Sequence, residues 1–261
     1  MSDAAIVARR STVWKPAPVL ARLCVLAFLL ALWEAAAFAG LVNAFIAPPP
    51  SAIFASFEML FVQEGLINAF VRTFAEALAA ASIGSVIGIV AGYWLHRFKL
   101  AGLAYTDWVA AMASAPLVLL YPLFLVIFGR NSATIVAMGV VGCLPPIILK
   151  AKEGLDGVRP VLLNVGRAYG LSRWAMFSMI QFPAALPTIF SGVRIGLLFA
   201  IINVVGVEYL IVFGGLGQMI SDLGDRFEIP GMYAGILFVV LVSICFFFIT
   251  EKIEKWLLSS K

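Results

Sequence analysis

Residues 71–95 read VRTFAEALAAASIGSVIGIVAGYWL, and this stretch decides the fold of the chain. After Arg72 and Glu76 near its start, residues 77–95 carry no charged side chain. A helix needs about 20 apolar residues to cross the hydrocarbon core of a bilayer. The stretch therefore predicts a transmembrane helix.

Glycines mark one face of this helix. Gly84, Gly88 and Gly92 recur every four residues, and Gly192 and Gly196 repeat the spacing in a later apolar stretch. Such stripes of small residues let helix backbones approach closely in lipid. The spacing predicts tight helix packing, and it leaves open whether the partner helix belongs to the same chain or to a second copy.

The composition of the whole chain agrees with a membrane protein. Of its 261 residues, 63% are apolar or aromatic and 12% are charged, whereas a soluble domain carries about 25% charged residues. No period-2 alternation is sustained, so helices are the expected spanning structure. We expect an all-α membrane protein with about six transmembrane helices, at 23–42, 71–95, 103–128, 133–149, 184–213 and 232–249.

The basic residues orient these helices. Fourteen of the 18 lysines and arginines lie in four segments: 1–22, 96–102, 150–182 and 250–261. Such an excess marks the cytoplasmic side of a membrane protein, so we expect both termini in the cytoplasm. The net charge of +4 is then a consequence of topology and needs no nucleic acid. We expect a cytoplasmic segment at 1–22 and a single transmembrane domain at 23–261.

The first predicted span and the loop after it each carry one further expectation. The apolar stretch 23–42 is longer than that of a signal peptide, so we expect it to remain as an anchor. After three prolines, Ser51 is the expected N-cap of a short amphipathic helix on the outer membrane surface.

Charged residues inside the predicted spans are costly and need a reason. Glu76 and Asp107 lie near the ends of their spans, where we expect the interface to solvate them. We expect Glu34 to make a structural hydrogen bond and Arg194 to extend to the cytoplasmic surface. For Glu208 two roles stay open, a polar lining for a pathway or a structural hydrogen bond.

Prolines interrupt two of the spans. Pro116 and Pro122 fall in the third span, and Pro145 and Pro146 fall in the fourth, so we expect kinks in both helices. Broken helices at membrane depth are tolerated where they line a cavity. We therefore predict a translocation pathway formed by Pro116, Tyr121, Asn203 and Glu208.

The sequence contains few of the residues that catalysis requires. Its one histidine, His96, lies at a predicted helix end, where we expect it to snorkel. The chain has no phosphate-binding loop of the Gly-x-x-x-x-Gly-Lys-[Ser/Thr] type. Its three cysteines lack the spacing of a metal site, and we expect them to pack as small apolar residues. We predict neither an enzyme, a metal site nor a bound cofactor.

The segment 150–182 resembles the cytoplasmic loop of the inner-membrane permeases of binding-protein-dependent ABC importers. Their loop has Glu-Ala-Ala, three residues, glycine, nine residues and Ile-x-Leu-Pro. Here Asn164-Val165-Gly166, Gly170 and Ile180-Gln181-Phe182-Pro183 keep every spacing, the glycine, the isoleucine and the proline. Glu-Ala-Ala is absent, and we expect Gly166 to make the loop less rigid. The flanking residues 168–174 and 182–187 resemble the nitrate, sulfonate and taurine branch.

The resemblance implies a mechanism. In such permeases the loop is a coupling element that docks on a cytoplasmic ATPase, so the expected coupling residues are Asn164, Arg167, Ala168, Gly170, Leu171 and Arg173. It further implies two permease copies (a homodimer), two ATPase subunits that hold ATP and magnesium, and a periplasmic binding protein. The location would be a bacterial inner membrane, and the solute small and anionic. The alternative is a secondary transporter driven by an ion gradient, with Glu208 as its ion or proton site.

Overall fold

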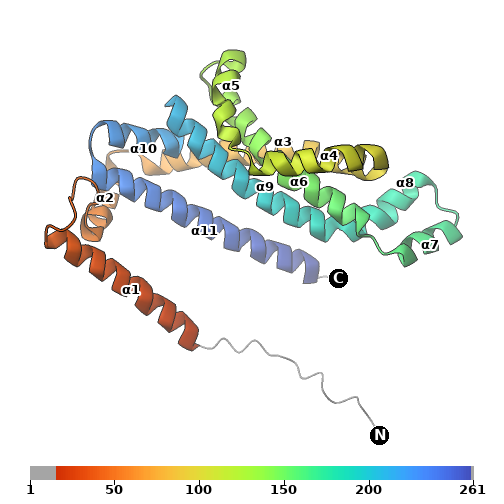
Figure 1. Ribbon diagram of the computed structural model, residues 1–261, viewed down its shortest axis with the longest axis horizontal. Helices are drawn as coiled ribbons and strands as arrows, with labels where there is room; N and C mark the ends of the chain where they lie inside the picture. Colours follow the sequence, from red (N-terminus) through yellow and green to blue (C-terminus); the bar gives the residue numbers. More distant parts are fainter. Residues whose placement is uncertain (1–15, 260–261) are drawn as a thin grey trace, which may run out of the picture. The chain divides into compact units, whose positions relative to one another are not determined.

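The computed structural model describes residues 16–259, and these residues form helices and connecting loops without a strand (Figure 1). This confirms the all-α expectation. Arg9, Arg10, Lys15 and Lys261 of the predicted cytoplasmic ends lie outside the described residues. The chain divides into two compact units, Met1–Ala55 and Ser56–Lys261, which are described separately.

In the first unit, α1 (Pro16–Phe38) is followed by a loop and the start of α2 (Pro50–Val62). The Glu34 carboxylate accepts two hydrogen bonds there, from the Ser51 amide at 3.0 Å and from the Ser51 hydroxyl at 2.6 Å. A structural hydrogen bond for Glu34 is thus confirmed. Ser51 as an N-cap is wrong, because α2 already begins at Pro50 and the Ser51 hydroxyl is used as a donor to Glu34.

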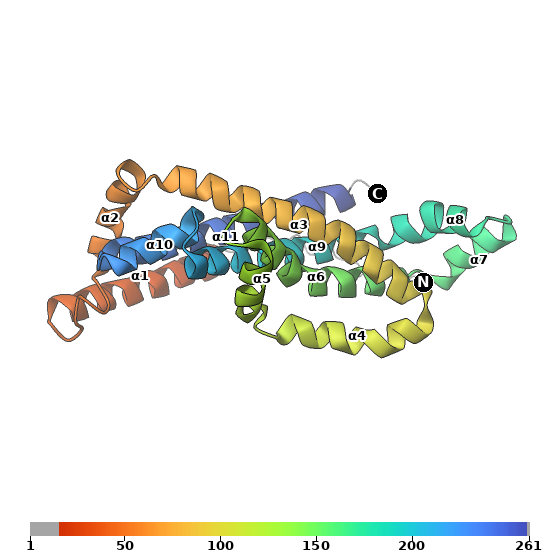
Figure 2. The same ribbon diagram turned by 90° about the horizontal axis from the view of Figure 1, so that it is seen from above.

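The second unit is a helical bundle in which α6 packs against both α3 and α9 (Figures 1 and 2). Its helices are α3 (Leu66–Arg97), α4 (Lys99–Ser114), η1 (Leu117–Leu120), α5 (Tyr121–Phe128), α6 (Ser132–Asp156), α7 (Pro160–Ala168), α8 (Arg173–Met176), η2 (Phe177–Gln181), α9 (Phe182–Ile211), α10 (Gly215–Asp225) and α11 (Ile229–Ser259). Both views place α7 and α8 at the opposite end of the bundle from α10.

Within residues 16–259, five helices are long and apolar enough to cross a membrane, and a sixth crossing would require the broken pair α4 and η1–α5. The two halves of this pair meet at an angle of 92°. The break falls at Ala115 and Pro116, where proline removes an amide donor. The kink expected in the span at 103–128 is therefore a full break at Pro116, with two helices that meet at a sharp angle.

The other prolines behave differently from the expectation. Pro122 lies in the first turn of α5, where a helix needs no amide donor. Pro145 and Pro146 lie inside α6, which continues through both of them to Asp156. Of the prolines expected to interrupt helices, only Pro116 lies at a break.

Both glycine stripes lie against α6. A Cβ atom on Gly88 would come within 2.7 Å of Cγ2 of Ile147, and one on Gly92 within 2.6 Å of Cβ of Ala151. From the other side, a Cβ on Gly196 would come within 2.5 Å of Cγ1 of Ile147. Gly84 lies against Cys143 and Gly192 against Lys150 in the same way. Here the partner of both stripes is a helix of the same chain, and α6 is the centre of the bundle.

Candidate translocation cavity and coupling segment

Residues 160–176 form a helix, a tight turn and a second helix. Pro160 begins α7, where its fixed φ suits the first turn. α7 ends at Ala168, and Gly170 follows it two residues later with a left-handed φ of +66°. The Gly170 amide donates to the Arg167 carbonyl at 3.0 Å. The Leu171 amide donates to the Gly166 carbonyl, also at 3.0 Å. The Ser172 hydroxyl then accepts from the Ala175 amide and caps α8.

Gly166 anchors this segment to the bundle. It is buried, and a Cβ atom there would come within 2.7 Å of both Ile180 and Met176. The expectation that Gly166 loosens the loop is therefore wrong, because the missing side chain lets α7 lie directly on α8 and η2. Close packing compensates for the low helix propensity of glycine at this position.

The outer side of the segment is exposed and largely apolar. Tyr169 is 81% exposed and Trp174 is 73% exposed, and Val161 and Val165 accompany them. Of the predicted coupling residues, Asn164, Arg167, Ala168, Gly170 and Arg173 are exposed and Leu171 is half-buried. Arg167 donates to the Asn164 side chain at 3.0 Å. Sequence reasoning missed the aromatic pair, although large apolar residues in a polar loop were a signal for it.

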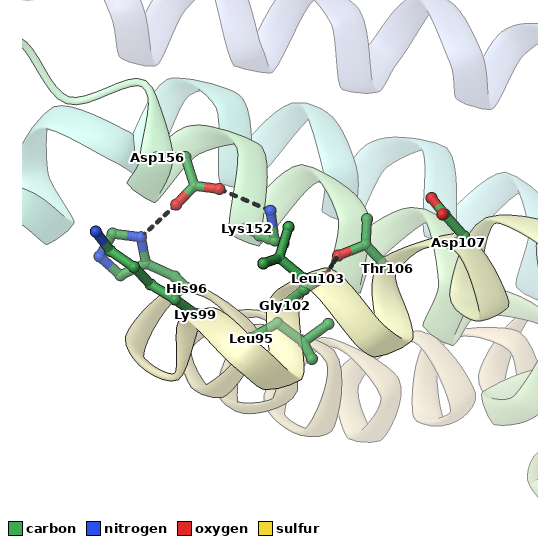
Figure 3. A pocket seen from close by; sticks show the side chains of 9 residues that line it. All are labelled: Leu95, His96, Lys99, Gly102, Leu103, Thr106, Asp107, Lys152 and Asp156. Carbon is green, nitrogen blue, oxygen red and sulfur yellow. Dashed lines mark hydrogen bonds and ion pairs between the residues drawn. The ribbon is translucent and has the colours of Figure 1, made fainter.

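A polar cluster lies where α6 approaches this segment (Figure 3). The Asp156 carboxylate contacts His96 Nδ1 at 2.6 Å and accepts from Lys152 Nζ at 2.8 Å. With Lys99 and Asp107 these side chains line a cavity of about 420 Å³ between α3, α4 and α6. His96 is thus paired with Asp156, contrary to the snorkelling expectation. Asp107 is exposed, and its solvation at the interface stays a prediction.

A second cavity, of about 310 Å³, lies at the break between α4 and η1. Pro116 and Val118 line it from the break, Gly142 from α6, and Asn203 and Gly206 from α9. Asn203 is the polar side chain among its lining residues, and its amide donates to the Phe199 carbonyl at 2.9 Å. Two of the predicted pathway residues, Pro116 and Asn203, therefore share one cavity.

The other two predicted pathway residues lie elsewhere. Tyr121 is half-buried against the apolar core. Glu208 is fully buried and absent from the cavity lining. Its Oε2 atom accepts from the Thr73 hydroxyl and from the Gly217 amide, both at 2.9 Å, while Thr73 Oγ1 accepts from the Leu216 amide. The prediction that Glu208 lines the pathway is wrong. Its carboxylate accepts from a backbone amide in the first turn of α10 and from Thr73 on α3, and so holds α10 against α3 and α9.

The expectations for two more charged residues, Glu76 and Arg194, are also wrong. Glu76 is buried with 7% of its surface exposed and accepts a long hydrogen bond from Arg72 Nε at 3.4 Å, so interface solvation is wrong for it. Arg194 does not simply extend to the surface. It pairs with Glu254 on α11 at 2.9 Å and lies over the ring of Phe247.

With this geometry established, the chain was compared with known proteins. The family described as "Binding-protein-dependent transport system inner membrane component" matches residues 84–259, which is more than half of the chain. The chain belongs to this family. The matched region contains the broken pair, the second cavity and all of residues 160–176, which correspond to the predicted coupling segment. These features therefore belong to an ABC transporter permease.

Individual proteins agree with this assignment. The permease is 27% identical over 220 residues to the putative aliphatic sulfonates transport permease SsuC of Bacillus subtilis, covering 83% of this chain and 78% of the relative. It is 30% identical over 183 residues to the glycine betaine/proline betaine transport permease ProW of Escherichia coli, covering 70% and 51%. Its fold is similar to a chain of the inward-facing MetNI methionine ABC transporter, with a TM-score of 0.63 at 21% identity over 73% of this chain and 94% of that one.

Proposed function

We propose that this ABC importer permease moves a small anionic solute, such as a sulfonate, nitrate or carboxylate, through the cavity at Pro116 and Asn203. The observation that carries the coupling proposal is the exposed apolar surface of residues 160–176, which is anchored to the bundle through Gly166. An exposed aromatic pair on a short, firmly packed segment suits docking into a groove of another protein.

The segment is connected to the cavity by continuous helix. Residues Arg173–Ile211 form one helical rod through α8, η2 and α9, with Trp174 near one end and Asn203 on the wall of the cavity. Trp174 and Asn203 are 29 residues apart, which is about 44 Å along a helix at 1.5 Å per residue. A displacement of Trp174 would therefore be transmitted over about this distance to the cavity wall. On the other side, α6 leads through Asp156 and Arg159 directly into α7.

The solute class rests on likeness and on what the cavity offers. SsuC is named for aliphatic sulfonates and ProW for betaines, so relatives of this permease serve small charged organic solutes. Asn203 offers an amide to such a solute, and no lysine or arginine lines the cavity. Discrimination would then fall to a separate binding protein, as expected when the passage has few specific contacts.

The proposed assembly has four further subunits. A second copy of this permease forms a homodimer, two ATPase subunits bind below with ATP and magnesium, and a periplasmic protein delivers the solute. The permease itself binds no cofactor and hydrolyses no ATP. The assembly lies in a bacterial inner membrane, with residues 150–182 in the cytoplasm.

A cysteine placed on the coupling segment tests this proposal. Ala168 is exposed at the end of α7, so Ala168→Cys should cross-link to the partner ATPase. Membrane-impermeant thiol reagents should label it in inside-out vesicles only. Labelling in intact spheroplasts would contradict both the topology and the docking site.

Solute class is tested separately with the reconstituted complex. ATP-dependent uptake of radiolabelled taurine, an alkane sulfonate, nitrate and glycine betaine is measured in proteoliposomes with the partner binding protein. We expect uptake of an anion and none of betaine. Uptake of betaine alone would overturn the anionic class, and uptake without the ATPase would indicate a secondary transporter.

A further inference from the structure

Two buried carboxyl groups on neighbouring helices each keep one oxygen atom without a hydrogen-bond partner. The atoms are Oε2 of Glu76 on α3 and Oε1 of Glu208 on α9. Glu208 is fully buried and Glu76 is 7% exposed. Among the described residues the third such side-chain atom is Nε of Arg194, which lies on a different part of α9.

The two carboxyl groups lie at the same turn of α3. The Thr73 hydroxyl donates to Oε2 of Glu208, and Thr73 precedes Glu76 by three residues on α3. Residues three apart on a helix are neighbours on its surface, so Glu76 lies beside the carboxyl group that Thr73 binds. Their remaining oxygens are occupied elsewhere: Oε2 of Glu208 accepts from Thr73 and Gly217, and Oε1 of Glu76 accepts from Arg72. The two unpartnered oxygens are therefore the ones left for the contact between the two groups.

The charges around the pair do not balance two carboxylates. Arg72 is the cation in contact, at 3.4 Å from Glu76, and it also donates to Ser132 and lies over the Phe213 ring. Asp222 on α10 lines an outer cavity with Arg72 and is itself hydrogen-bonded by Gln218. The remaining charged residue that lines this cavity is Glu64, which pairs with Arg226 at 2.8 Å.

Two ionised carboxylates in contact repel each other strongly in a medium of low dielectric constant. A single proton removes the repulsion, since a carboxylic acid donates one hydrogen bond to a neighbouring carboxylate. We propose that Glu76 and Glu208 form a proton-binding site and share one proton between their unpartnered oxygens. With Arg72 the cluster then carries no net charge, which suits its place inside a membrane protein.

A metal ion in place of the proton fits poorly. No group of three or more acidic, histidine or cysteine side chains that could hold a metal occurs among residues 16–259. The Arg72 guanidinium adjoins the pair and would repel a second cation. Gly214 and Gly215, at positive φ, lie directly against Arg72 and Glu208 and close the space there.

The pair connects four helices: α3, α6, α9 and α10. Through Glu208 the pair fixes the first turn of α10, and through Glu76 it reaches Arg72 and the start of α6 at Ser132. The inference is independent of the solute and of the ATPase, because it concerns the end of the bundle opposite the coupling segment.

Infrared difference spectroscopy tests the site directly. The full-length permease, labelled with ¹³C at its glutamate carboxyl groups, is reconstituted in lipid nanodiscs at neutral pH. We expect the C=O band of a protonated carboxylic acid in the natural protein and its loss in both Glu76→Gln and Glu208→Gln. The control Glu64→Gln, at the same end of the bundle, should keep the band. Absence of the band in the natural protein would overturn the proposal, and so would a band that survives Glu76→Gln.

Thermal unfolding gives a second measurement that does not depend on the band. Glutamine can donate its amide to the remaining carboxylate, so both single variants should fold and lose the proton. A native state that holds a proton which the unfolded chain releases loses stability as pH rises. The natural protein should therefore unfold at lower temperature in alkaline buffer, and Glu76→Gln should not share this shift. An equal shift in both proteins contradicts the shared proton.

Discussion

Gly166 and Gly170 serve the coupling segment in two different ways. Gly166 has ordinary helical geometry and is needed because Met176 and Ile180 occupy the space of a side chain. Gly170 has open space around its Cα, since no atom lies within 4 Å of an added Cβ. What Gly170 supplies is its φ of +66°, which the turn between α7 and α8 requires.

Replacing Gly170 separates backbone conformation from packing. Gly170→Val places a β-branched residue in the left-handed region, at a cost of about 1–2 kcal/mol, and should abolish uptake while the protein still inserts. Gly170→Asn is the matched control, because asparagine visits this region readily, and it should retain uptake. Transport is measured in proteoliposomes and insertion by membrane fractionation. Normal uptake by Gly170→Val would refute the requirement for this turn.

At the level of elements, α6 is held between α3 and α9 by direct backbone approach. Gly88 of α3 and Gly196 of α9 contact the same residue, Ile147, from two sides. Gly206 of α9 lies instead beside the cavity. A Cβ atom added to Gly206 would lie 3.6 Å from Cγ2 of Val118, which is its nearest neighbour. Two glycines in transmembrane helices therefore differ in what a methyl group would meet.

A single methyl group at these glycines should have opposite effects. Gly88→Ala forces Ile147 to move and should lower the free energy of unfolding by about 1–3 kcal/mol, as overpacked cores do. Gly206→Ala meets only an ordinary contact and should leave stability unchanged or slightly raised. Thermal unfolding of both variants in the same detergent measures the difference. Equal stability of the two variants would contradict the close approach of α3 and α6.

How much of the fold and of the site could be predicted from the sequence depends on how far apart in the sequence the contacting residues lie. Apolar length is a local property of the sequence, so five crossings were predictable. The coupling role of the loop at 150–182 came from its resemblance to a family motif and stays a prediction. The pairing of His96 with Asp156 joins residues 60 positions apart, and that of Thr73 with Glu208 joins residues 135 apart. No local pattern encodes such contacts. For the same reason, the burial of Glu76 was hidden by its position near the end of an apolar stretch.

On the scale of the whole molecule, the proposed ATPase-docking surface and the cavity are separated along one continuous helix, Arg173–Ile211. Trp174 lies near one end of it, and Asn203 lies on the cavity wall. Between them η2 has the wider turns of a π-helix, which are frequent at functional sites. By this route, motion of the exposed surface reaches Asn203 if the helix stays intact through η2.

Breaking the rod at Ser178 should uncouple ATP hydrolysis from transport. Ser178→Pro removes a backbone donor inside η2 and costs about 3 kcal/mol of helix stability, yet it leaves the exposed surface of α7 and Trp174 in place. The control Ser178→Ala loses only the hydrogen bond from the Ser178 hydroxyl to the Trp174 carbonyl, at 2.9 Å. We expect Ser178→Pro to co-purify with the ATPase and hydrolyse ATP without solute uptake, while Ser178→Ala transports normally. Retained uptake in Ser178→Pro would mean that the motion reaches the cavity by another route, of which α6 is the candidate, because it also connects the coupling segment to Gly142.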